Sequence, residues 1–199
     1  MVREPRTLPL ILASASPRRA ELLREAGYAA RIHAPPFGEP AIRGNRLSPA
    51  AWAEALSYYK ARSVLDALGE AVVLGGDTVV ALGGDIFGKP RDRDDARRIL
   101  RALRGTTHEV ITGVTLVAPA PHPRLIRHDR TRVSMRRVDD REVESYLDGG
   151  AWEGKAGAYG IQDEGDAFVT AIEGSFSNVV GFPMELVTRV LHEFGITPD

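Results

Sequence analysis

The chain contains no cysteine among its 199 residues. This absence excludes disulfide bonds, thiolate metal sites and a cysteine nucleophile. No apolar stretch approaches the roughly 18 residues that a membrane-spanning helix needs. The first residues, MVREPRTLP, also lack the apolar core of a signal peptide. We therefore expect a cytoplasmic protein with no membrane partner.

Neither sign of charge predominates, because 26 lysines and arginines balance 27 acidic residues and leave a formal net charge of −1. Without a broad positive field we expect no nucleic-acid partner. Lysine is scarce, and the only lysines are Lys60, Lys89 and Lys155. Where arginine is the usual cation, a lysine can mark a site that requires a compact ammonium group, although chance explains the pattern equally well.

Apolar runs and helical periodicity alternate along the chain, and 43% of the residues are hydrophobic, which suffices for a substantial core. Helices are predicted at 17–26, 49–68 and 183–194, and strands at 8–14 and 29–34. The turn sequences LGGDIF and PAPHP indicate antiparallel hairpins among these elements. Since no linker separates two halves, we expect a single domain over 1–199 with an α/β fold and a mixed sheet.

The stretch LILASASPRRAELL predicts a strand, a turn that contains serines, and a helix. Ser16 is a suitable N-cap and Pro17 a suitable first helical residue. Arg18 and Arg19 then fall in the first helical turn, where the helix dipole disfavours cations. A bound phosphate resolves this conflict, because helix amides, guanidinium groups and the hydroxyls of Ser14 and Ser16 can all bind its oxygens. Alternatively, both arginines are solvated and Ser16 is only a cap.

Charged residues at three further places could join such a site. Lys60 lies on the apolar face of the helix 49–68, so its ammonium either reaches the protein surface or faces a cleft that holds an anion. On the cleft interpretation, we expect Lys60→Met to be inactive but at least as stable as the wild type, because a buried charge is removed.

Asp77 follows an apolar run and requires a counter-charge, a metal or a reactive water, unless it only caps backbone amides in a turn. Thr78 can donate a hydrogen bond beside it, and Lys89 either folds back toward Asp77 or lies in a surface turn.

Two loops contribute weaker candidates. Glu39, in a loop rich in proline and glycine, is either a solvated residue or an oxygen ligand for Mg²⁺ or Mn²⁺. In GKAGAYGIQ the glycines allow close backbone approach. Tyr159 in this loop either stacks on a ring or simply packs, and Gln162 can donate to and accept from the edge of a base.

The motifs LASASPRRAELL, YYKA, GGDTVV, GKP, GKAGAYGIQ and EGSFSNVVGFP, in this order, resemble the Maf family of nucleoside triphosphate pyrophosphatases. The resemblance extends over nearly the whole chain. It implies the fold of the inosine triphosphatases, which is a long twisted mixed β-sheet flanked by helices, with two lobes and a cleft between them. It also implies hydrolysis of a nucleoside triphosphate to the monophosphate and pyrophosphate with a divalent metal, Mg²⁺ or Mn²⁺.

The resemblance also implies roles for individual residues. Asp77 corresponds to the proton acceptor of the family and, with Glu39, to its metal ligands, although PPFGEP keeps only the last acid of the usual D-I-D-E loop. The residues that correspond to substrate-binding positions are Ser14, Arg18, Arg19, Lys60, Thr78, Lys89 and Gln162. Of these, Arg18, Thr78 and Gln162 match positions linked to base selection. One branch of the family, which prefers 7-methyl-GTP, carries tryptophan in place of Arg18, so this chain resembles the branch that acts on dTTP and UTP.

The expected function is therefore the removal of dTTP, UTP or modified pyrimidine nucleotides, as a house-cleaning enzyme. Two alternatives remain open at this stage. One is a nucleotide-binding regulator of cell division without catalysis, and the other is a nucleotidyltransferase with an organic acceptor. Because many members of the family form dimers, the resemblance also implies a homodimer.

Overall fold

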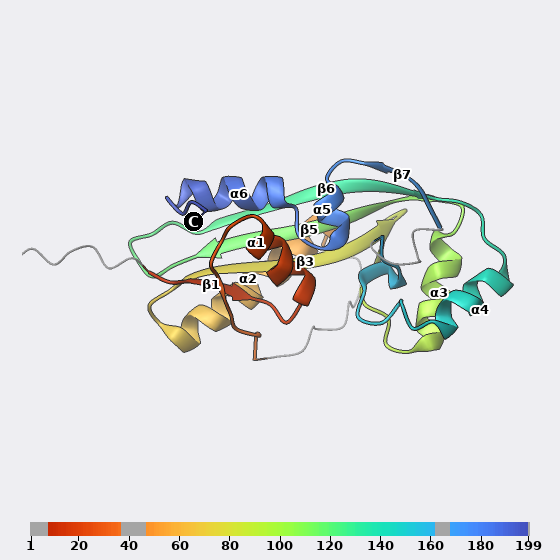
Figure 1. Ribbon diagram of the computed structural model, residues 1–199, viewed down its shortest axis with the longest axis horizontal. Coiled ribbons are helices and arrows are strands. Elements are labelled where there is room, and N and C mark those ends of the chain that lie inside the picture. The colour runs from red at the N-terminus through yellow and green to blue at the C-terminus, as the bar shows by residue number, and fades with distance from the viewer. Residues whose placement is uncertain (1–7, 37–46, 162–167, 199) are drawn as a thin grey trace, which may run out of the picture.

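The computed structural model describes residues 8–36, 47–161 and 168–198. Within them, seven strands form one open sheet, flanked by six α-helices and one short 3₁₀-helix (Figure 1). In chain order the elements are β1 (Leu10–Ala13), α1 (Pro17–Glu25), β2 (Arg31–Ile32), α2 (Pro49–Leu68), β3 (Val72–Leu82), β4 (Asp85–Phe87), α3 (Arg93–Leu103), β5 (Thr107–Val117), β6 (Leu125–Met135), α4 (Asp140–Asp148), η1 (Ala156–Ala158), β7 (Val169–Glu173), α5 (Phe176–Val180) and α6 (Met184–Glu193).

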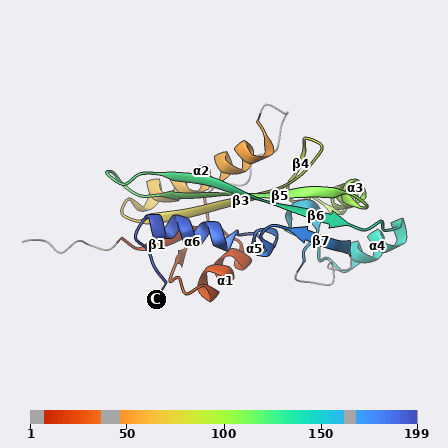
Figure 2. The same cartoon turned by 90° about the horizontal axis from the view of Figure 1, so that it is seen from above.

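The sheet has the order β2-β1-β3-β5-β6-β7, and β4 pairs with β3 beside this path. β1 runs parallel to both of its neighbours, whereas the other pairs are antiparallel. The predicted α/β fold with a mixed sheet is thus confirmed. In Figure 2, α2 lies on one face of the sheet, and α1 and α6 lie on the other. The two lobes with a cleft between them stay a prediction.

Local signals in the sequence account for most helix boundaries. α2 begins at Pro49 behind Ser48, whose side chain accepts a hydrogen bond from the amide of Ala51, and it ends at Gly69 in a left-handed conformation. α5 was not predicted, because its five residues are too few to show helical periodicity.

Among the described residues, none of the helices combines the length and apolar character needed to cross a membrane.

β3 is a single strand, although Gly75 and Gly76 divide its sequence into two apolar runs. On one side it pairs with β5 from Val73 to Ala81. On the other side it pairs first with β1, over Val72–Gly75, and then with β4, over Val80–Leu82. The stretch 76–79 therefore lies between the end of β1 and Phe87 at the end of β4. This notch in the sheet is the place where polar side chains of β3 can reach a ligand.

The glycines in the sheet let α2 approach it closely. A Cβ atom at Gly113 of β5 would lie 2.2 Å from the carbonyl oxygen of Ala53 in α2. At Gly75 of β3, a Cβ atom would lie 2.5 Å from the carbonyl oxygen of Ser57 in the same helix. Backbone atoms cannot rotate away as a side chain can, so these glycines set the distance between α2 and the sheet.

We expect Gly113→Ala to lower the free energy of unfolding by about 3 kcal/mol, because α2 must move away from the sheet. Urea titration of the folded fraction measures this loss. Gly149→Ala is the matched control, because its Cβ atom would meet only the carbonyl oxygen of Tyr146, at an ordinary 3.5 Å. We expect the control to change stability by less than about 1 kcal/mol. Equal unfolding midpoints for the two variants would contradict this account of α2 packing.

Candidate active site

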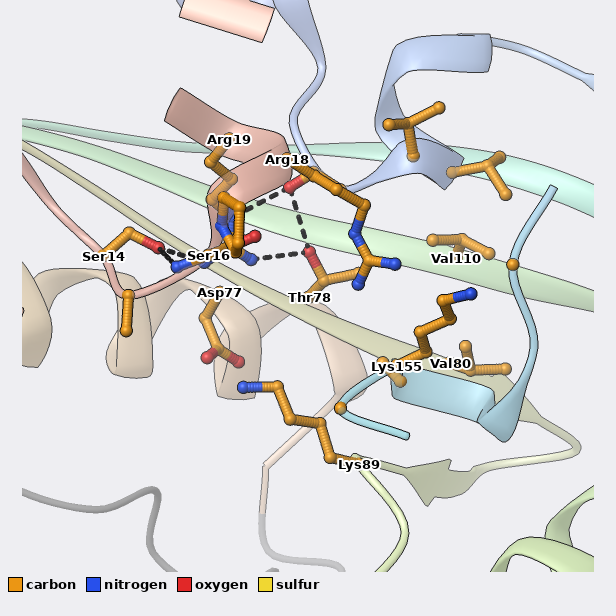
Figure 3. Close-up of a pocket in the computed structure, with 18 of the residues that line it drawn as sticks. Ser14, Ser16, Arg18, Arg19, Asp77, Thr78, Val80, Lys89, Val110 and Lys155 are labelled. Atoms are coloured by element: carbon orange, nitrogen blue, oxygen red, sulfur yellow. Dashed lines mark hydrogen bonds between the residues drawn. The ribbon is translucent and has the colours of Figure 1, made fainter. Parts of the chain in front are cut away.

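A pocket of about 780 Å³ opens at the notch of β3 (Figure 3). Its walls come from the start of α1, from α2, from β3, from the segment after β4, from the loop around η1, and from the end of α5. Each predicted site residue that the structure describes lines this pocket, namely Ser14, Arg18, Arg19, Lys60, Asp77, Thr78 and Lys89. The other two predicted site residues, Glu39 and Gln162, lie outside the described residues.

The N-terminus of α1 faces the pocket, but its cap differs from the one expected. Ser16 occupies the N-cap position before Pro17, yet its side chain makes no capping hydrogen bond. Instead the hydroxyl of Ser14 accepts a hydrogen bond from the amide of Ser16, at 3.1 Å. Ser16 thus occupies the predicted N-cap position, but its side chain does not accept from the amide of the second or third helical residue as a cap would. With no acidic residue in the first turn, this end of the helix is electrostatically suited to an anion.

Arg19 is buried and directs its guanidinium donors at the protein. Its Nε donates to the carbonyl oxygen of Gly181 at 2.9 Å, and its Nη1 to that of Gly76 at 2.7 Å. The hydroxyl oxygens of Thr78 and Ser14 accept from Nη2 and Nη1, at 2.9 Å and 3.4 Å. Arg19 therefore joins α1 to the notch of β3 and to the loop after α5. Its expected contact with a phosphate stays a prediction.

Lys60 and Asp77 form an ion pair at the bottom of the pocket. The ammonium nitrogen of Lys60 lies 2.5 Å from Oδ1 of Asp77, and the two residues are only 7% and 3% exposed. α2 supplies the lysine, and the notch of β3 supplies the aspartate. The alternative in which Lys60 reaches the protein surface is wrong, because the carboxylate of Asp77 holds its ammonium inside.

The other two predicted cations, Lys89 and Arg18, extend toward different parts of the pocket. Lys89, from the segment after β4, points its ammonium toward the carboxylate of Asp77 (Figure 3). The guanidinium of Arg18 extends past Thr78 toward the side where Val110 lies. One end of the pocket thus combines a carboxylate with ammonium groups, which is suited to a polyphosphate, while the other end carries a guanidinium beside apolar walls.

Lys155 is a pocket residue to which the sequence analysis assigned no role. It is 9% exposed, lines the pocket from the loop before η1, and extends along Gly160. Two features of the sequence could have indicated a role for Lys155. It is one of only three lysines, and it lies in a loop rich in glycine.

Tyr159 packs against β5 instead of lying open for stacking. Its hydroxyl lies 2.7 Å from Nε2 of His108, the two rings meet edge to face, and both residues are buried. Burial raises the pKa of Tyr159, so this hydroxyl stays neutral, and burial lowers the pKa of His108 to about 4. The pair supports the pocket wall as two neutral rings.

We expect His108 to make stability depend on pH in mildly acidic solution. Its pKa is about 4 in the folded protein and about 6.5 in the unfolded chain. Between these values the unfolded chain binds a proton that the folded protein does not, so the free energy of unfolding decreases as the pH falls. The loss amounts to about 3 kcal/mol by pH 4. Urea titrations of the wild type and His108→Gln at several pH values measure it, and equal pH dependence in the two proteins would contradict it.

A divalent cation would find few ligands among the described residues, where no three acidic or histidine side chains gather. The pocket nevertheless has the buried carboxylate of Asp77, and Glu153 is a further acidic residue in its lining. Mg²⁺ is commonly held by one or two carboxylates together with substrate phosphates and water, so this donor set fits such an ion.

Known proteins resemble this chain over nearly its whole length. A family profile described as "Maf-like protein" matches residues 9–194. The dTTP/UTP pyrophosphatase of Moorella thermoacetica is 44% identical, with 94% of this chain and 95% of that protein aligned. The protein of the same name from Pelotomaculum thermopropionicum is 41% identical over 94% of this chain and 96% of its own length. A third, from Koribacter versatilis, is 40% identical over 98% of this chain and its whole length.

Proposed function

The chain belongs to the Maf family, and from this premise we propose that it hydrolyses nucleoside triphosphates, preferably dTTP and UTP, to the monophosphate and pyrophosphate. The observation that carries the proposal is the single pocket in which Asp77 lies beside ammonium groups and the open end of α1. The pyrimidine preference is taken from relatives named for dTTP and UTP.

The triphosphate would lie along the end of the pocket that Asp77 and the two ammonium groups form. Lys60 and Lys89 supply positive charge there, and the amides at the start of α1 supply further donors. Negative charge develops on the leaving pyrophosphate during the reaction. Cations that are already in place stabilise this charge more in the transition state than in the ground state.

Asp77 is proposed as the general base. Lys60 holds Oδ1, which orients the carboxylate toward the pocket. A water molecule loses a proton to this carboxylate, and its oxygen bonds to the α-phosphorus. The bond from the α-phosphorus to the bridging oxygen breaks, and pyrophosphate leaves with the electron pair. A positioned base of this kind contributes about 10²–10⁴-fold to the rate.

A divalent cation, Mg²⁺ or Mn²⁺, is proposed as the cofactor, held by Asp77 and Glu39. When bound, it would neutralise charge on the phosphate oxygens. Two expectations from the family resemblance stay proposals, namely a homodimer and the removal of modified pyrimidine nucleotides. Two expectations from the sequence itself, a cytoplasmic location and a single domain over 1–199, also stay proposals.

The test is to incubate the purified protein with dTTP, UTP, CTP, ATP and GTP, each with Mg²⁺ or Mn²⁺, in water labelled with heavy oxygen. We expect pyrophosphate as the product, fastest from dTTP and UTP, with the label in the monophosphate because water attacks the α-phosphorus. Nucleotide binding without any pyrophosphate release would favour the non-catalytic regulator instead. Turnover only after an organic acceptor is added would favour a nucleotidyltransferase.

A further inference from the structure

Lys155 is the buried lysine of the pocket that the proposed chemistry does not use. Lys155 is 9% exposed and lines the pocket, so its ammonium group has a defined place in the pocket wall. The loop is built around this side chain, because a Cβ atom at Gly160 would lie 2.8 Å from Nζ of Lys155. Nearby, Gly157 takes a positive φ of 76°, and a Cβ atom there would lie 2.8 Å from Val80. The glycines of GKAGAYG thus create the space in which the lysine lies.

The ammonium of Lys155 lies on the opposite side of the pocket from Lys89 and Asp77, beside Val80 and Val110 (Figure 3). Since water attacks at Asp77, the reacting phosphate lies at the far side from Lys155. Val80 and Val110 give this side of the pocket apolar walls, and the guanidinium of Arg18 also extends toward it. A flat base fits between such walls, with cationic donors at its polar edge.

We propose that the ammonium of Lys155 donates a hydrogen bond to the O4 carbonyl of uracil or thymine, and that this contact selects UTP and dTTP over CTP. The inference rests on the proposed function of the pocket. An ammonium group can only donate hydrogen bonds. The O4 oxygen accepts one, whereas the amino group that cytosine carries at the same ring position is itself a donor. Two donors that face each other repel, so cytosine loses the hydrogen bond and meets a repulsion in its place.

The test compares kcat/KM for UTP, CTP and the triphosphate of the 2-pyrimidinone riboside, which lacks the substituent at position 4. We expect the wild type to favour UTP over both other nucleotides by at least about 10²-fold. Lys155→Met should lower kcat/KM for UTP by at least about 30-fold while changing the values for the other two by less than about threefold. The preference of the variant for UTP over the 2-pyrimidinone nucleotide then falls to about threefold.

Two further variants separate this role from a general effect of charge or folding. Arg24→Met removes an exposed cation of α1 that lies outside the pocket lining, and we expect its selectivity to equal that of the wild type. Gly160→Ala keeps the ammonium but pushes it from its place, so we expect a reduced ratio of UTP to CTP activity. If Lys155→Met fails to fold, Gly160→Ala and the wild-type comparison of nucleotides decide the question.

Equal losses for all three nucleotides in Lys155→Met would overturn the inference, because they would assign the lysine to the phosphates or to stability. A folded Gly160→Ala variant with wild-type selectivity would overturn it as well. So would a wild type that releases pyrophosphate from CTP as fast as from UTP, while the proposed pyrophosphatase activity would stand. Only a wild type that releases no pyrophosphate from any nucleotide would overturn the proposed function itself.

Discussion

Asp77→Asn is expected to lower the turnover of UTP by at least about 10²-fold and to leave nucleotide affinity largely unchanged. Asparagine has nearly the shape of aspartate but cannot accept the proton of the attacking water. The cations and the start of α1, which bind the phosphates, stay in place. Turnover is measured as pyrophosphate release at saturating UTP, and affinity by calorimetry with a non-hydrolysable analogue.

Asp85→Asn provides the matched control for this prediction. Asp85 is an exposed residue at the start of β4 and lies outside the pocket lining, so we expect wild-type turnover. Turnover near the wild-type value in Asp77→Asn would remove Asp77 from the mechanism. A loss that appears only in affinity would limit Asp77 to binding the substrate or the metal and would remove its role as the base.

Lys60→Met is expected to abolish most activity and to lower the free energy of unfolding by about 3–5 kcal/mol. The sequence alone suggests the opposite sign for stability, because it shows a lysine on an apolar face and no partner. The structure supplies the partner. With Lys60 gone, the carboxylate of Asp77 stays buried without the ammonium that lies 2.5 Å from it.

A double-mutant cycle separates this ion pair from other effects of the substitution. If the pair explains the loss, Lys60→Met combined with Asp77→Asn is more stable than the sum of the single losses predicts, by at least about 2 kcal/mol. Arg62→Met on the same helix is the control, because Arg62 and Asp66 form an exposed pair whose loss costs less than about 1 kcal/mol. Additive losses in the cycle would mean that Lys60 contributes to stability through packing and not through Asp77.

Much of the fold follows from local patterns in the sequence. α2 follows from Ser48, Pro49 and the glycine at position 69, and α3 begins behind Asp92, whose side chain accepts from the amide of Asp95. Caps, prolines and glycines act within a few residues, so their effect can be predicted without knowing the rest of the chain. The mixed sheet followed in the same way, from apolar runs and from the two hairpin turns.

The site was predicted as a set of residues but not as an arrangement of contacts. The sequence placed Arg19 on a phosphate, whereas in the structure its Nε and Nη1 donate to the carbonyl oxygens of Gly181 and Gly76. It left the ammonium of Lys60 with two possible directions, and it assigned nothing to Lys155. Each of these outcomes depends on groups that are distant in the sequence.

The amino-acid sequence by itself thus determined most of the secondary structure, the mixed sheet and the identity of many pocket residues. Only the tertiary structure decided which charged side chains lie in contact in the pocket. The reason is that the notch between β1 and β4 forms only when these two strands pair with β3. The physical reason is that periodicity and capping report the geometry of neighbouring residues. The partner of a buried charge is set instead by the packing of segments that the chain brings together from far apart.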